Sequence, residues 1–101
     1  MKLRMHREAQ DEVRDAIAYY AGVRDELAKE FTSAVRDAVT AIKEHAMMNS
    51  VPVPIKTSRR IRRRFLKGFP YAVVFEIRED ELLVVAVAHF RRRHGYWRKR
   101  T

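Results

Sequence analysis

Two apolar stretches separated by a short polar run dominate the second half of the chain. Apart from Glu76 and His89, residues 71–77 and 82–90 are β-branched, aromatic or aliphatic, which is typical of β-strands. The polar residues 78–81 between them have the length of a hairpin loop. Neither stretch alternates regularly between apolar and polar residues, so we expect both faces of the two strands to be covered. The pattern predicts an antiparallel hairpin at the centre of a small sheet.

The first half of the chain carries apolar residues at helical spacing. One stripe, beginning after Arg7 or Glu8, consists of Ala9, Val13, Ala16, Ile17 and Tyr20, and the next of Leu27, Phe31, Ala34, Val35, Ala38, Ile42 and Ala46. Such stripes are typical of amphipathic helices. We expect Gly22 to end the first helix in the left-handed conformation and Asp25 to cap the second. So short a connection predicts an antiparallel helical hairpin that packs on the sheet.

Three further segments complete the predicted order of elements. Lys2–His6 alternates weakly and predicts a short edge strand, whereas Pro52 and Pro54 predict a loop over residues 49–57. In the next segment Arg60, Arg62 and Arg64 alternate with other residues, so a strand would carry all three on one face. We therefore expect an α+β fold, in which an N-terminal strand and an antiparallel helical hairpin precede three or four strands of a small antiparallel sheet (β-α-α-β-β-β).

Composition limits the chain to a single domain. The 101 residues, 47% of them hydrophobic, allow one core, and residues 1–101 are expected to form one unit. There is no cysteine, which excludes disulfides and thiolate metal sites. The charged N-terminus does not resemble a signal peptide, and the longest apolar run, residues 82–88, is far shorter than the roughly 20 residues of a membrane span. We therefore expect a cytoplasmic protein that does not enter a membrane.

Positive charge is concentrated in the second half of the chain. Residues 1–55 hold eight Lys or Arg and nine Asp or Glu, whereas residues 56–101 hold fourteen and four, so net charges of −1 and +10 give the total of +9. Such asymmetry attracts polyanions and acidic proteins. The four acids of residues 76–81 lie in or beside the hairpin turn, where we expect them to be solvated.

If the last strands form a meander, the arginines of residues 60–64 and of residues 91–93 should come together on one surface. Arginine forks there would bind phosphates, and the rings of Tyr71, Tyr96 and Trp97 could stack on bases. An alternative is that Tyr96 and Trp97 close the core while the arginines only keep the protein soluble. A lone histidine such as His89, at the end of an apolar strand, is more often structural than catalytic.

No metal or cofactor is expected. His89 and His94 lack a neighbouring carboxylate or cysteine that would complete a metal site. The three glycines are scattered along the chain and cannot form a phosphate-binding loop.

Three segments resemble the RelE/ParE superfamily of type II toxin–antitoxin toxins over nearly the whole chain. They are EAQDEVRDAIAYYAGVRDELAKEFTSAVRDAVTAIKEH, RRIRRRFLKGFPYAVVFEI and VVAVAHFRRRHGYWRKR. The most specific parts are residues 69–77, the sequence Ala88-His89-Phe90-Arg91-Arg92, and the pair Tyr96-Trp97. The resemblance implies the same α+β fold and one of two targets.

One branch of the superfamily cleaves mRNA in the ribosomal A site without metal, and the other poisons DNA gyrase. The resemblance to the nuclease branch would assign catalytic roles to Arg62, Arg64, Arg92 and Tyr96. However, Ala72 stands where that branch typically has an arginine facing the scissile phosphate. Loss of one preorganised charge commonly lowers an electrostatically catalysed rate by about 10² to 10³. The short sequences Phe69-Pro70-Tyr71-Ala72 and His89-Phe90-Arg91-Arg92 also resemble ParE-like toxins more closely. The resemblance therefore favours a toxin that acts on gyrase.

For a ParE-like toxin, we expect the target to be bound by residues of the basic strand and of the C-terminal region: Arg60, Arg63, His89, Arg91, Arg93 and Trp97. Either branch implies a cognate antitoxin whose acidic or amphipathic C-terminal segment covers the toxin in a hetero-oligomer. The edge strand Lys2–His6 would be available for pairing with it. A non-catalytic, basic nucleic-acid-binding module remains a third possibility.

Overall fold

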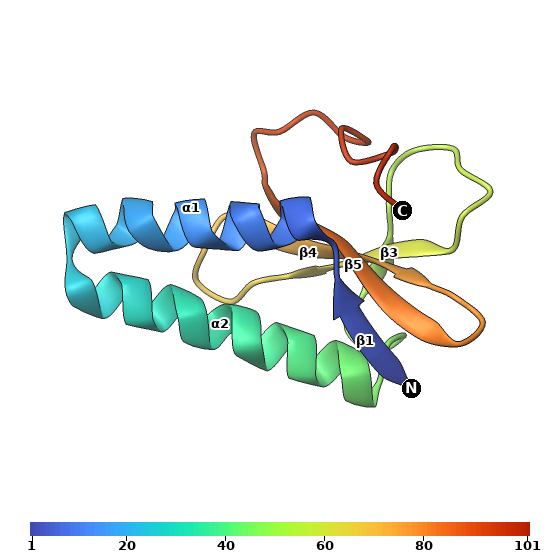
Figure 1. Cartoon of the computed structure of the whole chain (residues 1–101), viewed down its shortest axis with the longest axis horizontal. Helices are drawn as coiled ribbons and strands as arrows, with labels where there is room; N and C mark the ends of the chain where they lie inside the picture. Colours follow the sequence, from blue (N-terminus) through green and yellow to red (C-terminus); the bar gives the residue numbers. More distant parts are fainter.

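The computed structural model describes all 101 residues. Its elements follow in the order β1 (Lys2–Met5), α1 (Arg7–Val23), α2 (Asp25–Glu44), β2 (Val51–Pro52), β3 (Ile61–Phe65), β4 (Tyr71–Ile77) and β5 (Glu81–His89). The predicted order of a strand, two helices and then strands is confirmed. The helices form an antiparallel hairpin whose tip extends past the sheet (Figure 1). Neither helix combines the length and apolarity needed to cross a membrane.

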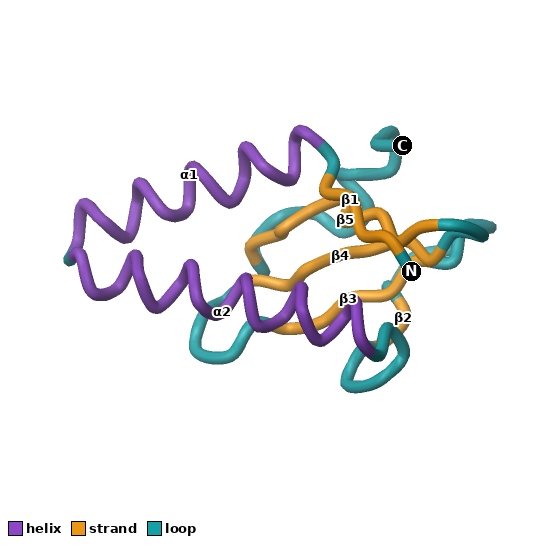
Figure 2. The backbone as a smooth tube through the Cα atoms, turned by 60° about the horizontal axis from the view of Figure 1, so that its bottom comes forward, coloured by secondary structure: helices purple, strands orange, loops and turns teal.

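The five strands lie in the order β1-β5-β4-β3-β2 (Figure 2). Strands β3, β4 and β5 form the predicted antiparallel meander. However, β1 pairs with β5 in parallel, so the prediction of a wholly antiparallel sheet was wrong. No local turn joins β1 to β5, and the chain passes through both helices and three strands between them. The direction of β1 is therefore set by tertiary packing rather than by a hairpin.

The predicted loop over residues 49–57 contains a two-residue strand, β2, at the outer edge of the sheet. Pro52 pairs with Arg62 there, which is possible because an edge strand need not donate a hydrogen bond on its outer side.

The connection between the helices differs from the prediction. Helix α1 continues through Gly22, whose φ is not positive, and the predicted left-handed end is therefore wrong. A single extended residue, Arg24, ends α1 and precedes α2. Asp25 is the first residue of α2 and not its cap, and its carboxylate lies in the first turn, where the helix dipole favours negative charge.

Two apolar cores cover the two faces of the sheet, as the lack of alternation predicted. The helices pack on one face in a cluster that includes Phe31, Val73, Phe75, Val84 and Val87. The other face is covered by the C-terminal segment, residues 90–101, and by the loop before β3, with a cluster of Ile61, Val74, Leu83, Val85, Ala86 and Trp97. In Figure 1 these two covering segments lie next to each other at the upper right. The same sheet therefore has a helix side and a C-terminal side.

Candidate functional site

A cleft of ≈ 170 Å³ opens on the C-terminal side of the sheet. Its lining includes Ala72 and Ala88, which pair across β4 and β5, and Val74 of β4. The basic residues around it are Arg63, Arg92, Arg93, His89 and His94. No aspartate or glutamate lines the cleft. We call this site the basic cleft.

Strand β3 contributes one cation and one aromatic ring to the basic cleft. Because side chains alternate along a strand, Arg63 and Phe65 share the face of their partners Val74 and Ala72. The guanidinium carbon of Arg63 lies 5.1 Å from the centroid of the Phe65 ring. Its Nε is buried and has no hydrogen-bond partner.

Two exposed aromatic rings form one wall of the basic cleft. Phe65 is 47% exposed and Phe90 is 54% exposed. Their ring centroids are 5.7 Å apart at an interplanar angle of 87°, the edge-to-face arrangement that aromatic pairs favour. Exposed apolar rings beside unpaired cations are typical of a binding surface.

Tight turns after β5 place the remaining arginines. The N–H of Arg92 donates to the carbonyl of His89 at 3.0 Å, and the N–H of Tyr96 donates to the carbonyl of Arg93 at 3.2 Å. Gly95 adopts a φ of +80°, which a residue with a Cβ rarely adopts. The guanidinium carbon of Arg92 lies 3.8 Å from the centroid of the Tyr96 ring. The ring of Tyr96 is therefore covered from within the chain.

The arginines of the basic cleft have no acidic partner within the chain. Neither Arg63, Arg92 nor Arg93 forms an ion pair with a carboxylate of the chain. Six other arginines do: Arg4 with Glu81, Arg14 with Asp11, Arg24 with Glu26, Arg59 with Glu76, Arg78 with Glu76 and Glu81, and Arg100 with Glu8 and Glu12. Part of the excess positive charge of the second half is therefore available at the cleft for a partner.

A network centred on Glu12 anchors the C-terminal segment to the edge of β5. Its carboxylate accepts hydrogen bonds from the Tyr96 hydroxyl at 2.6 Å, from the Val87 N–H at 3.0 Å and from Nη1 of Arg100 at 2.9 Å. The same Nη1 donates to the Val85 carbonyl at 3.0 Å. Strand β1 pairs with β5 only as far as Val84, so these groups satisfy the part of the edge that β1 leaves unpaired.

The network also fixes the protonation state of Tyr96. Burial, the hydrogen bond to Glu12 and the nearby negative charge raise the pKa of Tyr96 well above its ordinary value. The phenol therefore stays protonated and donates to a fixed acceptor. Sequence reasoning missed Glu12; the available signal was an acid three residues after Ala9 and four before Ala16, beside the buried stripe of α1.

A second network ties the C-terminus to the loop before β3. Arg59 donates to both carboxylate oxygens of Glu76 and to the carbonyls of Arg98 and Arg100. Glu76 is only 9% exposed, so the expectation that it is solvated was wrong. Burial alone would raise the pKa of Glu76, but hydrogen bonds from Arg59 and Arg78 outweigh burial and hold this pKa below its ordinary value.

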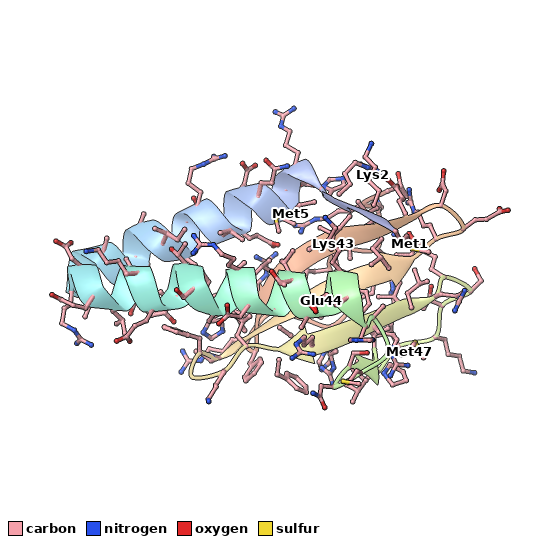
Figure 3. All side chains as sticks on the ribbon, turned by 90° about the horizontal axis from the view of Figure 1, so that it is seen from below. Met1, Lys2, Met5, Lys43, Glu44 and Met47 are labelled. Atoms are coloured by element: carbon pink, nitrogen blue, oxygen red, sulfur yellow. The ribbon has the colours of Figure 1, made fainter.

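The other strand arginines point to the helix side. Arg62 and Arg64 pair with Phe75 and Val73, which belong to the core beneath the helices. Nε of Arg62 donates to the Ser50 hydroxyl at 2.7 Å, and Nη1 of Arg64 donates to the Met48 carbonyl at 3.1 Å. These partners lie in the loop after α2, where Figure 3 shows Met47. The alternation of β3 thus divides the arginines, and the prediction of one shared basic surface was wrong.

The remaining predicted residues take different positions. Arg60 and Arg91 are exposed, and His89 lines the basic cleft while its Nδ1 accepts the Arg91 N–H at 3.0 Å. Trp97 is 4% exposed and belongs to the core on the C-terminal side, so its ring closes that core, as the alternative interpretation expected. No three His, Asp or Glu side chains lie close enough together to hold a metal ion.

Comparison with known proteins identifies similar proteins. Residues 3–94 match the family described as the ParE toxin of the type II toxin–antitoxin system parDE. A solved structure described as the chromosomal ParDE toxin–antitoxin system from P. aeruginosa is similar, with a TM-score of 0.74, 17% identity, and coverage of 88% of this chain and 95% of that one. At this identity the structural match supports the fold alone. No curated protein matches the chain significantly.

Proposed function

Because the chain belongs to the ParE toxin family of type II toxin–antitoxin systems, we propose that it inhibits bacterial growth by acting on DNA gyrase in the cytoplasm and is neutralised by a cognate antitoxin. The observation that carries the choice of gyrase is the division of the arginines. Arg62 and Arg64 lie on the helix side, whereas Arg92 and Tyr96 lie on the C-terminal side. A metal-independent nuclease needs such groups preorganised around one phosphate.

The state of individual side chains also argues against RNA cleavage. Ala72 is 4% exposed and lines the basic cleft, so an apolar methyl group stands where the nuclease branch would place an arginine. The hydroxyl of Tyr96 is already bound to Glu12. Both features favour a surface that binds a protein over one that cleaves a phosphodiester.

The free edge of β1 is a suitable docking site for the antitoxin. It lies at the opposite edge of the sheet from β2. Strand β1 pairs with β5 along one side only, and its other side presents unpaired backbone groups. We propose that an extended segment of the antitoxin adds to this edge, and that acidic residues of the antitoxin neutralise part of the net charge of +9. The result would be a hetero-oligomer of toxin and antitoxin.

The test compares two targets with one set of variants. The full chain is expressed with and without its cognate antitoxin. It is then assayed for gyrase supercoiling and cleavage and for translation-coupled mRNA cleavage. We expect growth arrest only without antitoxin, inhibited gyrase and intact mRNA. The double variant Arg62→Ala and Arg64→Ala should still inhibit gyrase, because both side chains bind the loop after α2.

Cleaved mRNA, abolished by that double variant, would refute action on gyrase and support the nuclease alternative. Steeply salt-dependent binding to free DNA or RNA without growth inhibition would instead indicate a non-catalytic nucleic-acid-binding module.

A further inference from the structure

We propose that the basic cleft binds an acidic peptide segment of a protein partner and holds one aromatic side chain of that segment over Ala72, Val74 and Ala88. The inference rests on the proposed function in one respect, namely that the partner is a protein. It adds the chemistry of the segment that the partner must present.

The size and apolar lining of the basic cleft suit a single ring. Its volume of ≈ 170 Å³ compares with the roughly 150 Å³ of an apolar protein cavity that binds benzene. Ala72 and Ala88 pair with each other across β4 and β5, and their small side chains leave space above the sheet. The exposed rings of Phe65 and Phe90 stand beside this space and can make edge-to-face contacts with an inserted ring.

The charges around the cleft suit carboxylates next to that ring. Arg63, Arg92 and Arg93 have no acidic partner within the chain, and Nε of Arg63 is buried without an acceptor. Carboxylates of the bound segment would pair with these guanidinium groups in the forked geometry that arginine favours.

A nucleic acid base fits the same site less well. Stacking needs accessible ring faces, but Arg92 already covers Tyr96 at 3.8 Å and Trp97 is 4% exposed. Phe65 and Phe90 meet at 87° and so offer no pair of parallel faces. A base edge also needs hydrogen-bond acceptors as well as donors, whereas the charged side chains of the cleft are donors and Nδ1 of His89 already accepts the Arg91 N–H.

The test measures binding of short labelled probes to the folded full chain by fluorescence anisotropy. The main probe is a pentapeptide with a central phenylalanine flanked on each side by two acidic residues. One control probe has a central alanine, a second has lysines as flanking residues, and a third is a ten-nucleotide single strand. We expect the main probe to bind at least about tenfold more tightly than each control.

Matched variants locate the binding. Arg63→Gln and Arg93→Gln should each weaken binding of the main probe about tenfold or more, which corresponds to the 1.5–3 kcal/mol of a charged hydrogen bond. Arg36→Gln removes the same charge from an exposed residue of α2 outside the cleft and should leave binding unchanged. Circular dichroism verifies that each variant is folded, and Arg93 is exposed, so its replacement should not disturb the core.

Three results would overturn the proposal: equal binding of the alanine and phenylalanine probes, tighter binding of the oligonucleotide, or equal loss of binding in Arg36→Gln. Gyrase inhibition is measured on the same preparations. Inhibited gyrase without peptide selectivity refutes only this inference. Selective peptide binding without any effect on gyrase supports the site but refutes gyrase as the target.

Discussion

Replacing Glu12 by glutamine should release the C-terminal segment from the sheet before the rest of the molecule unfolds. The Glu12 side chain is 15% exposed and that of Arg100 is 11% exposed, so water screens this ion pair poorly. Glutamine keeps the shape of the side chain but removes its charge, and its amide turns an N–H group toward one set of donors. At least one of Tyr96, Val87 and Arg100 then loses its acceptor.

The size of the effect follows from these contacts. Breaking a buried ion pair by removing one partner costs about 3–5 kcal/mol, and glutamine retains one carbonyl acceptor worth about 1 kcal/mol. We therefore expect Glu12→Gln to lower the free energy of unfolding by about 2–4 kcal/mol. That is a large share of the roughly 5–15 kcal/mol typical of a whole domain.

Two spectroscopic probes distinguish release of the C-terminal segment from unfolding of the whole domain. Trp97 is the only tryptophan, belongs to the C-terminal segment and is buried in the core on that side of the sheet. Its fluorescence therefore reports whether that segment is packed on the sheet. Far-ultraviolet circular dichroism reports α1 and α2. During urea denaturation of Glu12→Gln, we expect the fluorescence transition to precede the dichroism transition.

The matched control is Asp15→Asn, which removes the same charge from an exposed position one turn later on α1. It should change stability by less than about 0.5 kcal/mol. Equal stabilities of the two variants, or wild-type stability of Glu12→Gln, would refute the view that this carboxylate holds the C-terminal segment.

Three further predictions concern stability. The folded-state pKa of Glu76 lies below its ordinary value of 4.5. Its contribution to the free energy of unfolding is therefore complete above pH 4.5 and is lost as the pH falls through the lowered pKa. Glu76→Gln should flatten the dependence of stability on pH in this range, and an unchanged acid unfolding curve would contradict the prediction. Gly95→Ala should lower the free energy of unfolding by about 1–3 kcal/mol, because φ is +80° and the new Cβ would lie 2.9 Å from Nε of Arg98. Gly22→Ala should raise it by about 0.5–1 kcal/mol, because Gly22 lies in a helix with open space around it. Changes of the same sign in thermal unfolding of the two variants would contradict this reasoning. Arg62→Ala should expose the loop after α2 to limited proteolysis because the Ser50 hydroxyl and carbonyl lose their donors, and an unchanged cleavage pattern would show that this anchor is unimportant.

Neighbouring arginines of β3 lie on opposite sides of the sheet, and the sequence predicted only part of this arrangement. Alternation correctly placed Arg62 and Arg64 on one face of the strand, with Arg63 on the other. It did not reveal which face the helices cover, because both faces of the adjacent strands are apolar. The assumption that all arginines meet at one surface therefore failed, although each local element was predicted.

The acids of the chain show the same limit. The positions of Glu12 and Glu76 near apolar residues did not reveal their partners, since Arg100 is 88 residues from Glu12 and Arg59 is 17 residues from Glu76. Such pairs form only once the C-terminal segment and the loop before β3 have packed on the sheet. Sequence periodicity reports neighbours within a few residues and cannot report these contacts.

By itself, the sequence determined the helical hairpin, the β3–β5 meander, the family and the concentration of positive charge, because each depends on local periodicity or on residues close together in the chain. Only the tertiary structure decided the parallel pairing of β1, the division of arginines between two sides, the burial of Trp97 and the basic cleft. These depend on which segments pack on which face of the sheet, and distant contacts and the burial of both faces decide that packing.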